Sequence, residues 1–502
     1  MTRLTRLVWS VATVVILFAL PTNLTAAQAI PAPSVDPGRV PADDKPGPDQ
    51  PMRQSNVCAR PITVSDPNVS VTAPGFTMLN VSKAWQYSTG NGVPVAVIDT
   101  GISPTRRLPV VAGGDYIMGG DGLLDCDAHG TIVASVIRAA PQGIPMPAPM
   151  PPAPVYPAPA GEPANGPGAP EPGQPEDPEV AALPQDTPDG VVGVAPHAVL
   201  ISIRQSSRAY EAVNPQPGDI DTRRKAGTVA TLAKAIVHAA NMGAKVINIS
   251  VTSCVSAADP LDQSAVGAAV WYAATVKDAV IVAAAGNDGE ESCAQNPVFD
   301  PLDPSDPRDW HQVKTVSSPS WFADYVLAVG AVDNAGMPIA KSLAGPWVAA
   351  AAPGVGIMGL SPQTAGAVNA YPPNRPGEQA MPFWGTSFSA AYVSGVAALV
   401  RAKYPQLSAH QVINRIVQTA HNPPRGVDNQ VGYGVVDPVA ALTFDVPPGD
   451  LVAPGAQSRV IVPVAPPPAP DHRARGMALV FAGAVLAAVM LSAIIKRARR
   501  AR

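Results

Sequence analysis

The stretch VPVAVIDTG at residues 93–101 decides the fold class that the sequence predicts. Val93 to Ile98 form a nearly continuous apolar run, which is typical of a strand buried on both faces of a parallel sheet. Asp99-Thr100-Gly101 follow this run directly. The acid Asp99 is therefore expected at the carboxyl end of a buried strand, on the rim of the sheet.

The same pattern recurs along the chain, with helical stretches in between. Residues 229–242 place apolar side chains at helical spacing, for example at Leu232 and Ile236, and Gly243 would end that helix. Strands that alternate with helices predict an α/β fold, a doubly wound and mostly parallel sheet with helices on both faces. The further strands are expected at Val199–Ile203, Val246–Val251, Val280–Ala285 and Val326–Val332.

Composition and charge exclude two classes of protein. Of 502 residues, 46% are hydrophobic and 14% are charged, so the chain is not a disordered acidic or basic polymer. The 34 Lys+Arg and 38 Asp+Glu nearly cancel, and no domain-sized segment forms a basic face. We therefore expect no nucleic-acid partner.

The N-terminus indicates export. Arg3 and Arg6 precede an apolar run from Leu7 to Leu20, and the small residues Ala27-Gln28-Ala29 follow. This order predicts a signal peptide over residues 1–29. An uncleaved anchor is the alternative, but the run is shorter than the ~20 residues that span a bilayer.

The C-terminus indicates membrane attachment. Met477 to Ile495 carry no charge and are long enough to form a transmembrane helix in the lipid bilayer. Residues 496–502 are basic, so the positive-inside rule predicts a cytoplasmic tail. We expect a single-pass protein of the cell membrane whose folded part lies outside the cytoplasm, on the periplasmic side.

Proline is concentrated in three stretches, because it is excluded from regular elements. We expect an irregular N-terminal extension at 30–60, a surface insertion at 141–190 and a linker at 446–476 that precedes the membrane helix. A single catalytic domain is then predicted at 61–445. An insertion of ~50 residues is tolerable if its two ends already lie close together, since loop closure costs grow slowly with length.

Three motifs carry one reactive group each. Asp99 ends the first strand. His129 lies in the motif DAHGT, where the first turn of a helix predicted over residues 132–140 would present it, and Ser387 lies in GTSFSAA at the start of an apolar helix through Val400. Backbone N–H groups at a helix N-terminus favour developing negative charge on such a serine. Taken singly, each motif has an ordinary alternative: a capping acid, a surface histidine and an N-cap serine.

A fourth motif, AAAGN, places Asn287 just past a buried strand, where its amide would donate to an oxyanion. The alternative is a turn residue before Asp288 and Gly289. Asp125 and Asp127 beside the histidine raise the alternative of a small metal cluster. The neighbourhood holds one histidine and no HExxH spacing, so we expect no metal and no cofactor.

The chain order Asp99, His129, Ser387 is that of subtilisin and differs from those of chymotrypsin and the α/β-hydrolases. The motifs VAVIDTG, HGT, AAAGN and GTSFSAA resemble those of the subtilase family (peptidase S8) over roughly residues 60–140 and 190–445. One departure is Ala391, which stands where many subtilases carry a proline.

The resemblance implies a subtilisin-like fold and a serine endopeptidase that cleaves protein or peptide substrates through an acyl-enzyme. It implies His129 as the general base, Asp99 as the group that orients the imidazole, and Ser387 as the nucleophile. Asn287 and the backbone N–H of Ser387 would hold the oxyanion.

The chain combines a predicted signal peptide, a short N-terminal extension, a Pro-rich insertion after the histidine helix, the motif GTSFSAAYVSG and a C-terminal anchor. This combination is similar to that of one branch of the family, the mycosins, which are membrane-anchored subtilases associated with mycobacterial type VII secretion. This resemblance implies a type VII secretion membrane complex as a partner. The alternative function is a structural component of that complex, with proteolysis accessory. A third possibility, a dinucleotide-binding protein, fails because no GxGxxG follows the first strand.

The four cysteines of an exported protein are expected to form two disulfides. Cys254 follows one predicted strand and Cys293 the next, and neighbouring parallel strands lie about 4.8 Å apart with their ends on the same side. We therefore predict that Cys254 pairs with Cys293. The remaining pair, Cys58 with Cys126, would tie the N-terminal extension to the loop before His129.

Overall fold

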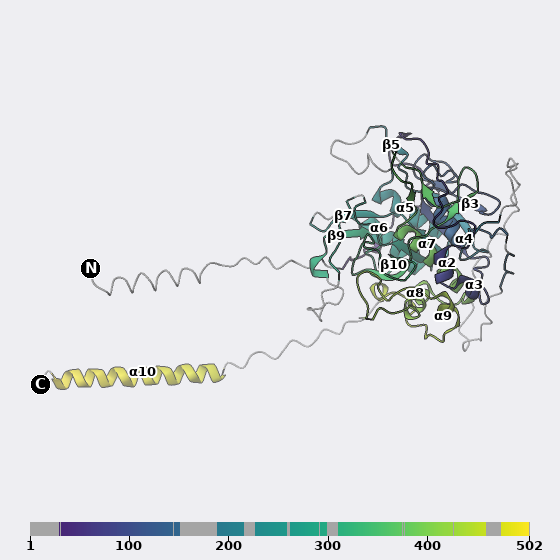
Figure 1. Cartoon of the computed structure of the whole chain (residues 1–502). Helices are drawn as coiled ribbons and strands as arrows, with labels where there is room; N and C mark the ends of the chain where they lie inside the picture. Colours follow the sequence, from purple (N-terminus) through teal and green to yellow (C-terminus); the bar gives the residue numbers. More distant parts are fainter. Residues whose placement is uncertain are drawn as a thin grey trace, which may run out of the picture. The chain divides into compact units, whose positions relative to one another are not determined.

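Strand β2 (Pro94–Asp99) lies inside a seven-stranded sheet in the computed structural model (Figure 1). The strand order is β11-β10-β8-β6-β2-β4-β3, and every neighbouring pair is parallel. The predicted α/β class is confirmed. The other strands of this sheet are β3 (Val110–Asp115), β4 (Val199–Arg204), β6 (Val246–Ile249), β8 (Val280–Ala284), β10 (Val326–Val332) and β11 (Val348–Pro353).

The structure describes residues 30, 32–143, 145–150, 188–214, 226–258, 262–290, 292–298, 310–373, 375, 377–424, 426–457 and 473–500. The predicted signal peptide, most of the predicted insertion and part of the predicted linker lie outside these residues.

All five predicted strands are present, with small differences at their ends. Strand β2 starts one residue late, and β6 ends two residues before the predicted Val251. Strands β3 and β11 were not predicted. The helix predicted over residues 132–140 is α4 (His129–Arg138), so His129 is its first residue.

Helices cover both faces of the sheet. The side chains of a strand alternate between its two faces, so the apolar side chains on each face are buried under a separate set of helices. Val95 and Val97 of β2 pack in one cluster with helices α4 and α7 (Thr386–Lys403). Ala96 and Ile98 pack in a second cluster with α5 (Val229–Asn241) and α6 (Ser264–Trp271). All four strand side chains are fully buried.

The smaller elements surround this core. They are η1 (Pro37–Arg39), β1 (Met52–Gln54), α2 (Pro74–Met78), α3 (Val81–Ala84), β5 (Tyr210–Ala212), β7 (Ser253–Ser256), the π-helical turn η2 (Tyr272–Val276), η3 (Trp310–Gln312), β9 (Thr315–Ser318), β12 (Gly359–Leu360), β13 (Ala367–Val368), β14 (Ala370–Tyr371), β15 (Met381–Pro382), α8 (Ala409–Gln418), α9 (Pro438–Thr443) and η4 (Pro454–Ala456).

The residues predicted as an N-terminal extension pack along the rest of the folded domain with little regular structure. Strand β1 pairs antiparallel with β5. Asp43 accepts a hydrogen bond from Asn241 and contacts Nδ1 of His238 at 2.7 Å, and Asp49 accepts one from Lys234. Val35 and Val40 also pack against the cluster that contains α5 and α6. The extension is therefore held by polar contacts, a short strand and apolar contacts with the domain rather than by its own core.

The two ends of the predicted insertion lie close together, as its tolerance requires. Arg107 donates to both carboxylate oxygens of Asp189 at 2.7 and 3.0 Å and to the carbonyl of Ala140 at 2.9 Å. Arg107 and Asp189 are each 13% exposed. The same side chain donates to the carbonyl of Val191 at 2.6 Å, so one arginine links the residue before the predicted insertion to the residue after it.

Helix α10 (Arg473–Arg500) forms a unit separate from the residues up to Gln457. Its segment Met477–Arg499 is long and apolar enough to cross a membrane. This segment contains the predicted transmembrane residues 477–495.

Candidate active site

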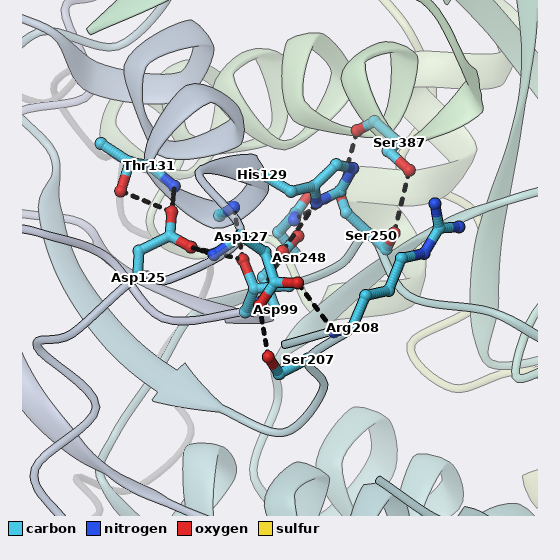
Figure 2. Close-up of polar contacts among 12 residues, drawn as sticks. Asp99, Asp125, Asp127, His129, Thr131, Ser207, Arg208, Asn248, Ser250 and Ser387 are labelled. Carbon is cyan, nitrogen blue, oxygen red and sulfur yellow. Dashed lines mark hydrogen bonds and ion pairs between the residues drawn. The ribbon is translucent and has the colours of Figure 1, made fainter. Parts of the chain in front are cut away.

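Asp99 and His129 meet at the carboxyl edge of the sheet. Asp99 is the last residue of β2 and is fully buried. Its Oδ1 lies 2.7 Å from Nδ1 of His129, the first residue of α4 (Figure 2). The same oxygen accepts the N–H of Thr100 at 2.7 Å. The imidazole is therefore oriented with Nδ1 toward the acid and Nε2 away from it.

The glycine of the HGT motif permits this approach. A Cβ at Gly130 would lie 2.1 Å from the carbonyl oxygen of Gly101 and 3.2 Å from Asp99. The N–H of Gly130 donates to Oγ1 of Thr100 at 2.9 Å. Any side chain at position 130 would push α4 away from the end of β2.

Asp125 links the end of β2 to the first turn of α4 through hydrogen bonds. Its Oδ1 accepts from Oγ1 of Thr100 and from the N–H of Asp127, and its Oδ2 accepts from the N–H and Oγ1 of Thr131. Sequence reasoning weighed Asp125 only as part of a metal cluster and missed this role. The residue is 2% exposed, and burial raises the pKa of its carboxyl to about 7 against the lowering effect of these hydrogen bonds.

Asp127 connects the histidine loop to the segment after β4. Its carboxylate accepts from the hydroxyl of Ser207 and, at 2.7 Å, from the N–H of Arg208. Burial raises the pKa of Asp127, against the effect of these two donors. Asp125 and Asp127 therefore serve as hydrogen-bond acceptors. Among the described residues, no group of three or more His, Cys, Asp or Glu side chains is arranged to hold a metal.

Ser387 lies in the first turn of α7, as predicted. Gly385 precedes the helix with φ +138°, a conformation that side chains rarely adopt. The Ser387 hydroxyl donates to the carbonyl of Ser250 at 2.9 Å, and the Ser250 hydroxyl donates to the carbonyl of Ser387 at 2.9 Å (Figure 2). Ser250 directly follows β6, the neighbour of β2.

The hydroxyl of Ser387 is thus directed at Ser250 and not at His129. Catalytic hydrogen bonds are often unformed without substrate and close in the Michaelis complex. A rotation of one side-chain torsion turns this hydroxyl away from the Ser250 carbonyl. Ser387 is 8% exposed, so a substrate carbonyl has limited but real access to it.

The side-chain amide of Asn287 is oriented by the residue before the serine. Its Oδ1 accepts from the N–H of Thr386 at 3.0 Å and from Oγ1 of Thr386 at 3.1 Å. The amide nitrogen is then directed to the opposite side, where it lies 3.4 Å from Oε2 of Glu290. Asn287 is therefore fixed as a donor close to the N-terminus of α7.

The pKa of His129 reflects two opposing effects. Burial lowers it, but the charge and the hydrogen bond of Asp99 outweigh burial, so the net direction is upward. The ring also packs against Phe388 with centroids 5.4 Å apart. Asp99 therefore stabilises the imidazolium, which is the form that arises when a histidine takes up a proton.

Both predicted disulfides are present. Cys58 is joined to Cys126, and Cys254 to Cys293. The first bond attaches the extension to the loop that precedes His129. The second joins strand β7 to the segment after Asn287. Each bond therefore braces one loop at the edge of the candidate site.

Comparisons with known proteins agree with this geometry. A model of the subtilase family matches residues 90–434. Mycosin-2 of Mycobacterium tuberculosis is 66% identical to the chain, over 97% of this chain and 96% of that protein. Mycosin-5 of the same organism is 46% identical, over 89% of this chain and 88% of that protein.

Solved structures give the same result. The crystal structure of MycP1 from Mycobacterium smegmatis superposes with a TM-score of 0.72 at 42% identity, over 86% of this chain and 99% of that chain. A chain in the periplasmic assembly of the ESX-5 inner membrane complex superposes with a TM-score of 0.72 at 50% identity, over 87% of this chain and 100% of that chain.

Fold, site and relatives define one class of enzyme, a serine protease on a doubly wound α/β sheet. The chain belongs to the subtilase family and, within it, to the mycosins. The apolar helix α10, together with the membrane complexes that hold related chains, supports a single-pass membrane protein.

Proposed function

We propose that Asp99, His129 and Ser387 are the catalytic triad of this protease, with Asn287 in the oxyanion hole. His129 removes the proton of Ser387 as the hydroxyl attacks a peptide carbonyl, and Asp99 stabilises the resulting imidazolium. The amide of Asn287 and the backbone N–H of Ser387 hold the tetrahedral oxyanion. The 2.7 Å contact between Asp99 and His129 beside the N-terminus of α7 is the observation that carries this proposal.

A serine-directed fluorophosphonate tests the nucleophile. It should label the purified protein at Ser387 only, and Ser387→Ala should abolish both labelling and peptide cleavage. Labelling of Ser387→Ala at the wild-type level would overturn the assignment. Because the change removes a single oxygen from a short side chain, the melting temperature should stay close to that of the wild type.

The second proposal concerns location and assembly. We propose that the protein is held in the cell membrane by residues 477–495, with its protease domain outside the cytoplasm and its basic tail inside, in association with a type VII secretion membrane complex. Supporting observations are the basic residues that follow the apolar segment and the similarity to chains of the ESX-5 inner membrane complex. We also propose cleavage of residues 1–29 as a signal peptide.

A scaffold function, with proteolysis accessory, is the alternative that the same similarity favours. Two variants separate the roles in a deletion strain. Full-length Ser387→Ala keeps the membrane helix and the docking surfaces, whereas a chain that ends near Val446 keeps the proposed triad and loses the helix. If full-length Ser387→Ala restores secretion and the truncated chain does not, the scaffold has the essential role. If only proteolytically active forms restore secretion, the scaffold function is excluded.

A further inference from the structure

An ion pair crosses the proposed active site above two strands of the sheet. Nη2 of Arg208 lies 3.7 Å from Oε2 of Glu290. Arg208 follows β4 and Glu290 follows β8, and the sheet order β8-β6-β2-β4 places β6 and β2 between them. With strands about 4.8 Å apart, the two loops start roughly 14 Å apart. The pair therefore joins two loops that follow the strands on either side of those that lead to Asp99 and Ser250.

The backbone of Arg208 is fixed on both sides. Its N–H donates to Asp127 at 2.7 Å, and its carbonyl accepts from Nδ2 of Asn56 at 2.9 Å. Asn56 belongs to the extension, and the Cys58–Cys126 disulfide joins that extension to the loop of Asp127. The Arg208 side chain is 63% exposed.

The guanidinium also acts on the proposed catalytic base. Burial and Asp99 dominate the pKa of His129, and the positive charge of Arg208 adds a smaller lowering effect. Arg208 lies in the same group of polar residues as His129 and Ser387 (Figure 2).

Glu290 competes for the oxyanion donor. The Oε2 atom that faces Arg208 is the same atom that lies 3.4 Å from the amide nitrogen of Asn287. Thr386 occupies Oδ1 of Asn287, so the nitrogen is the side of the amide left for a ligand. A carboxylate oxygen at this position takes the donor that the proposed mechanism assigns to the substrate oxyanion.

We propose that Arg208 and Glu290 are specificity-determining residues that close the proposed cleft with a displaceable ion pair. A peptide reaches the Asn287 amide only after it separates the pair. A peptide that brings a carboxylate to Arg208 or an ammonium group to Glu290 replaces the lost contact, whereas an uncharged peptide does not. This inference rests on the proposed triad and oxyanion hole, and it predicts discrimination against uncharged substrates.

The test compares the wild type with Arg208→Gln, Glu290→Gln and the double variant on a fluorogenic peptide library without charged residues. Because both side chains are partly exposed, Glu290→Gln should raise kcat/KM about two- to fivefold, the range expected of an exposed ion pair. Arg208→Gln leaves the Glu290 carboxylate beside the Asn287 amide, so it should give a smaller gain. The double variant should gain no more than Glu290→Gln, since one pair is lost only once. Lower kcat/KM in the single variants, or gains that multiply in the double variant, would overturn the proposal.

Glu211→Gln is the matched control. Glu211 lies three residues after Arg208 and pairs with Arg53 on the N-terminal extension, so its loss changes charge on the same segment without opening the pair at Asn287. Its kcat/KM should equal that of the wild type. A gain equal to that of Glu290→Gln would show that net charge alone is responsible and would refute the proposal.

Two further readouts complete the experiment. Fluorophosphonate labelling at Ser387 shows that each variant is folded. If the wild type itself is not labelled, the proposed triad is refuted rather than the ion pair. Full labelling without any gain in kcat/KM refutes the ion pair alone. Higher ionic strength screens exposed charges, so salt should accelerate the wild type more than Glu290→Gln, and an equal response in both would also count against the pair.

Discussion

The Asp99 carboxylate and the His129 imidazole, thirty residues apart in the chain, meet through a single 2.7 Å contact. Asp99 is fully buried, and among the described residues its Oδ2 has no hydrogen-bond partner. The contact with His129 and the Thr100 N–H therefore carry the stabilisation of this buried charge. The orientation of the imidazole depends on the acid in return.

Asp99→Asn should leave the fold intact and depress kcat by about 10⁴, the size of effect seen when a triad acid is replaced by its amide. The amide stabilises the wrong imidazole tautomer and cannot stabilise the imidazolium. Steady-state kinetics and circular dichroism of the purified variant provide the check. A kcat within tenfold of the wild type would exclude Asp99 from the triad.

The pH profile follows from the raised pKa of His129. The proposed base acts when neutral, so kcat/KM should rise with pH through that pKa, and the midpoint should lie above the ordinary histidine value of about 6.5. The same group stabilises the fold below pH about 6.5 and loses this contribution as the pH rises through the folded-state pKa. A midpoint at or below 6.5 would contradict the dominance of Asp99.

Asn287→Ala should lower kcat by about 10²–10³ with little change in KM, because the lost donor acts on the oxyanion that forms in the transition state. The magnitude is that of the corresponding loss in subtilisin, the reference case for this effect. Separate determination of kcat and KM provides the measurement. A change confined to KM would assign Asn287 to substrate binding instead.

Asp125→Asn should flatten the pH dependence of stability. Burial raises the Asp125 pKa from 3.8 to about 7, so the folded chain binds this proton more tightly than the unfolded chain. Its contribution to stability is therefore largest at acidic pH and is lost as the pH rises from about 4 to about 7. Asparagine cannot titrate, and its NH₂ group would face hydrogen-bond donors, so the melting temperature should fall and vary less with pH. An unchanged slope would show that Asp125 does not titrate in this window.

Arg107→Ala should destabilise the domain, because it leaves the largely buried Asp189 without its bidentate partner. Proteolytic cleavage within the predicted insertion should leave activity and melting temperature nearly unchanged, because its composition of Pro, Ala and acidic residues offers few large apolar side chains to a core. Differential scanning calorimetry of both forms tests this contrast. A drop of many degrees after cleavage would show that the insertion contributes to the fold.

The sequence predicted the central strands and the proposed site because their signals are local. Val93 to Ile98 is an apolar run, and the DTG, HGT and GTS motifs place a reactive group at the end or start of an element. Strand β3 contains Gly113 and Gly114 and has one exposed valine, Val111, and β11 consists mainly of alanine, so neither shows a β-type pattern.

The remaining features of the site depend on contacts between distant segments. The hydrogen bonds of Asp125 require Thr100 and Thr131 to be brought together by β2 and α4. The Arg208–Glu290 pair requires the order of four strands, which one sequence does not reveal. The direction of the Ser387 hydroxyl toward Ser250 depends on a side-chain torsion, which no motif encodes.

Cysteines that are consecutive in the chain pair with each other, Cys58 with Cys126 and Cys254 with Cys293. When the N-terminal end of a chain is the first part to leave a translocation channel, the first two thiols emerge before the third. On the proposed route of export, each bond can then close in the order of emergence, and pairing in that order gives the two bonds of the folded protein.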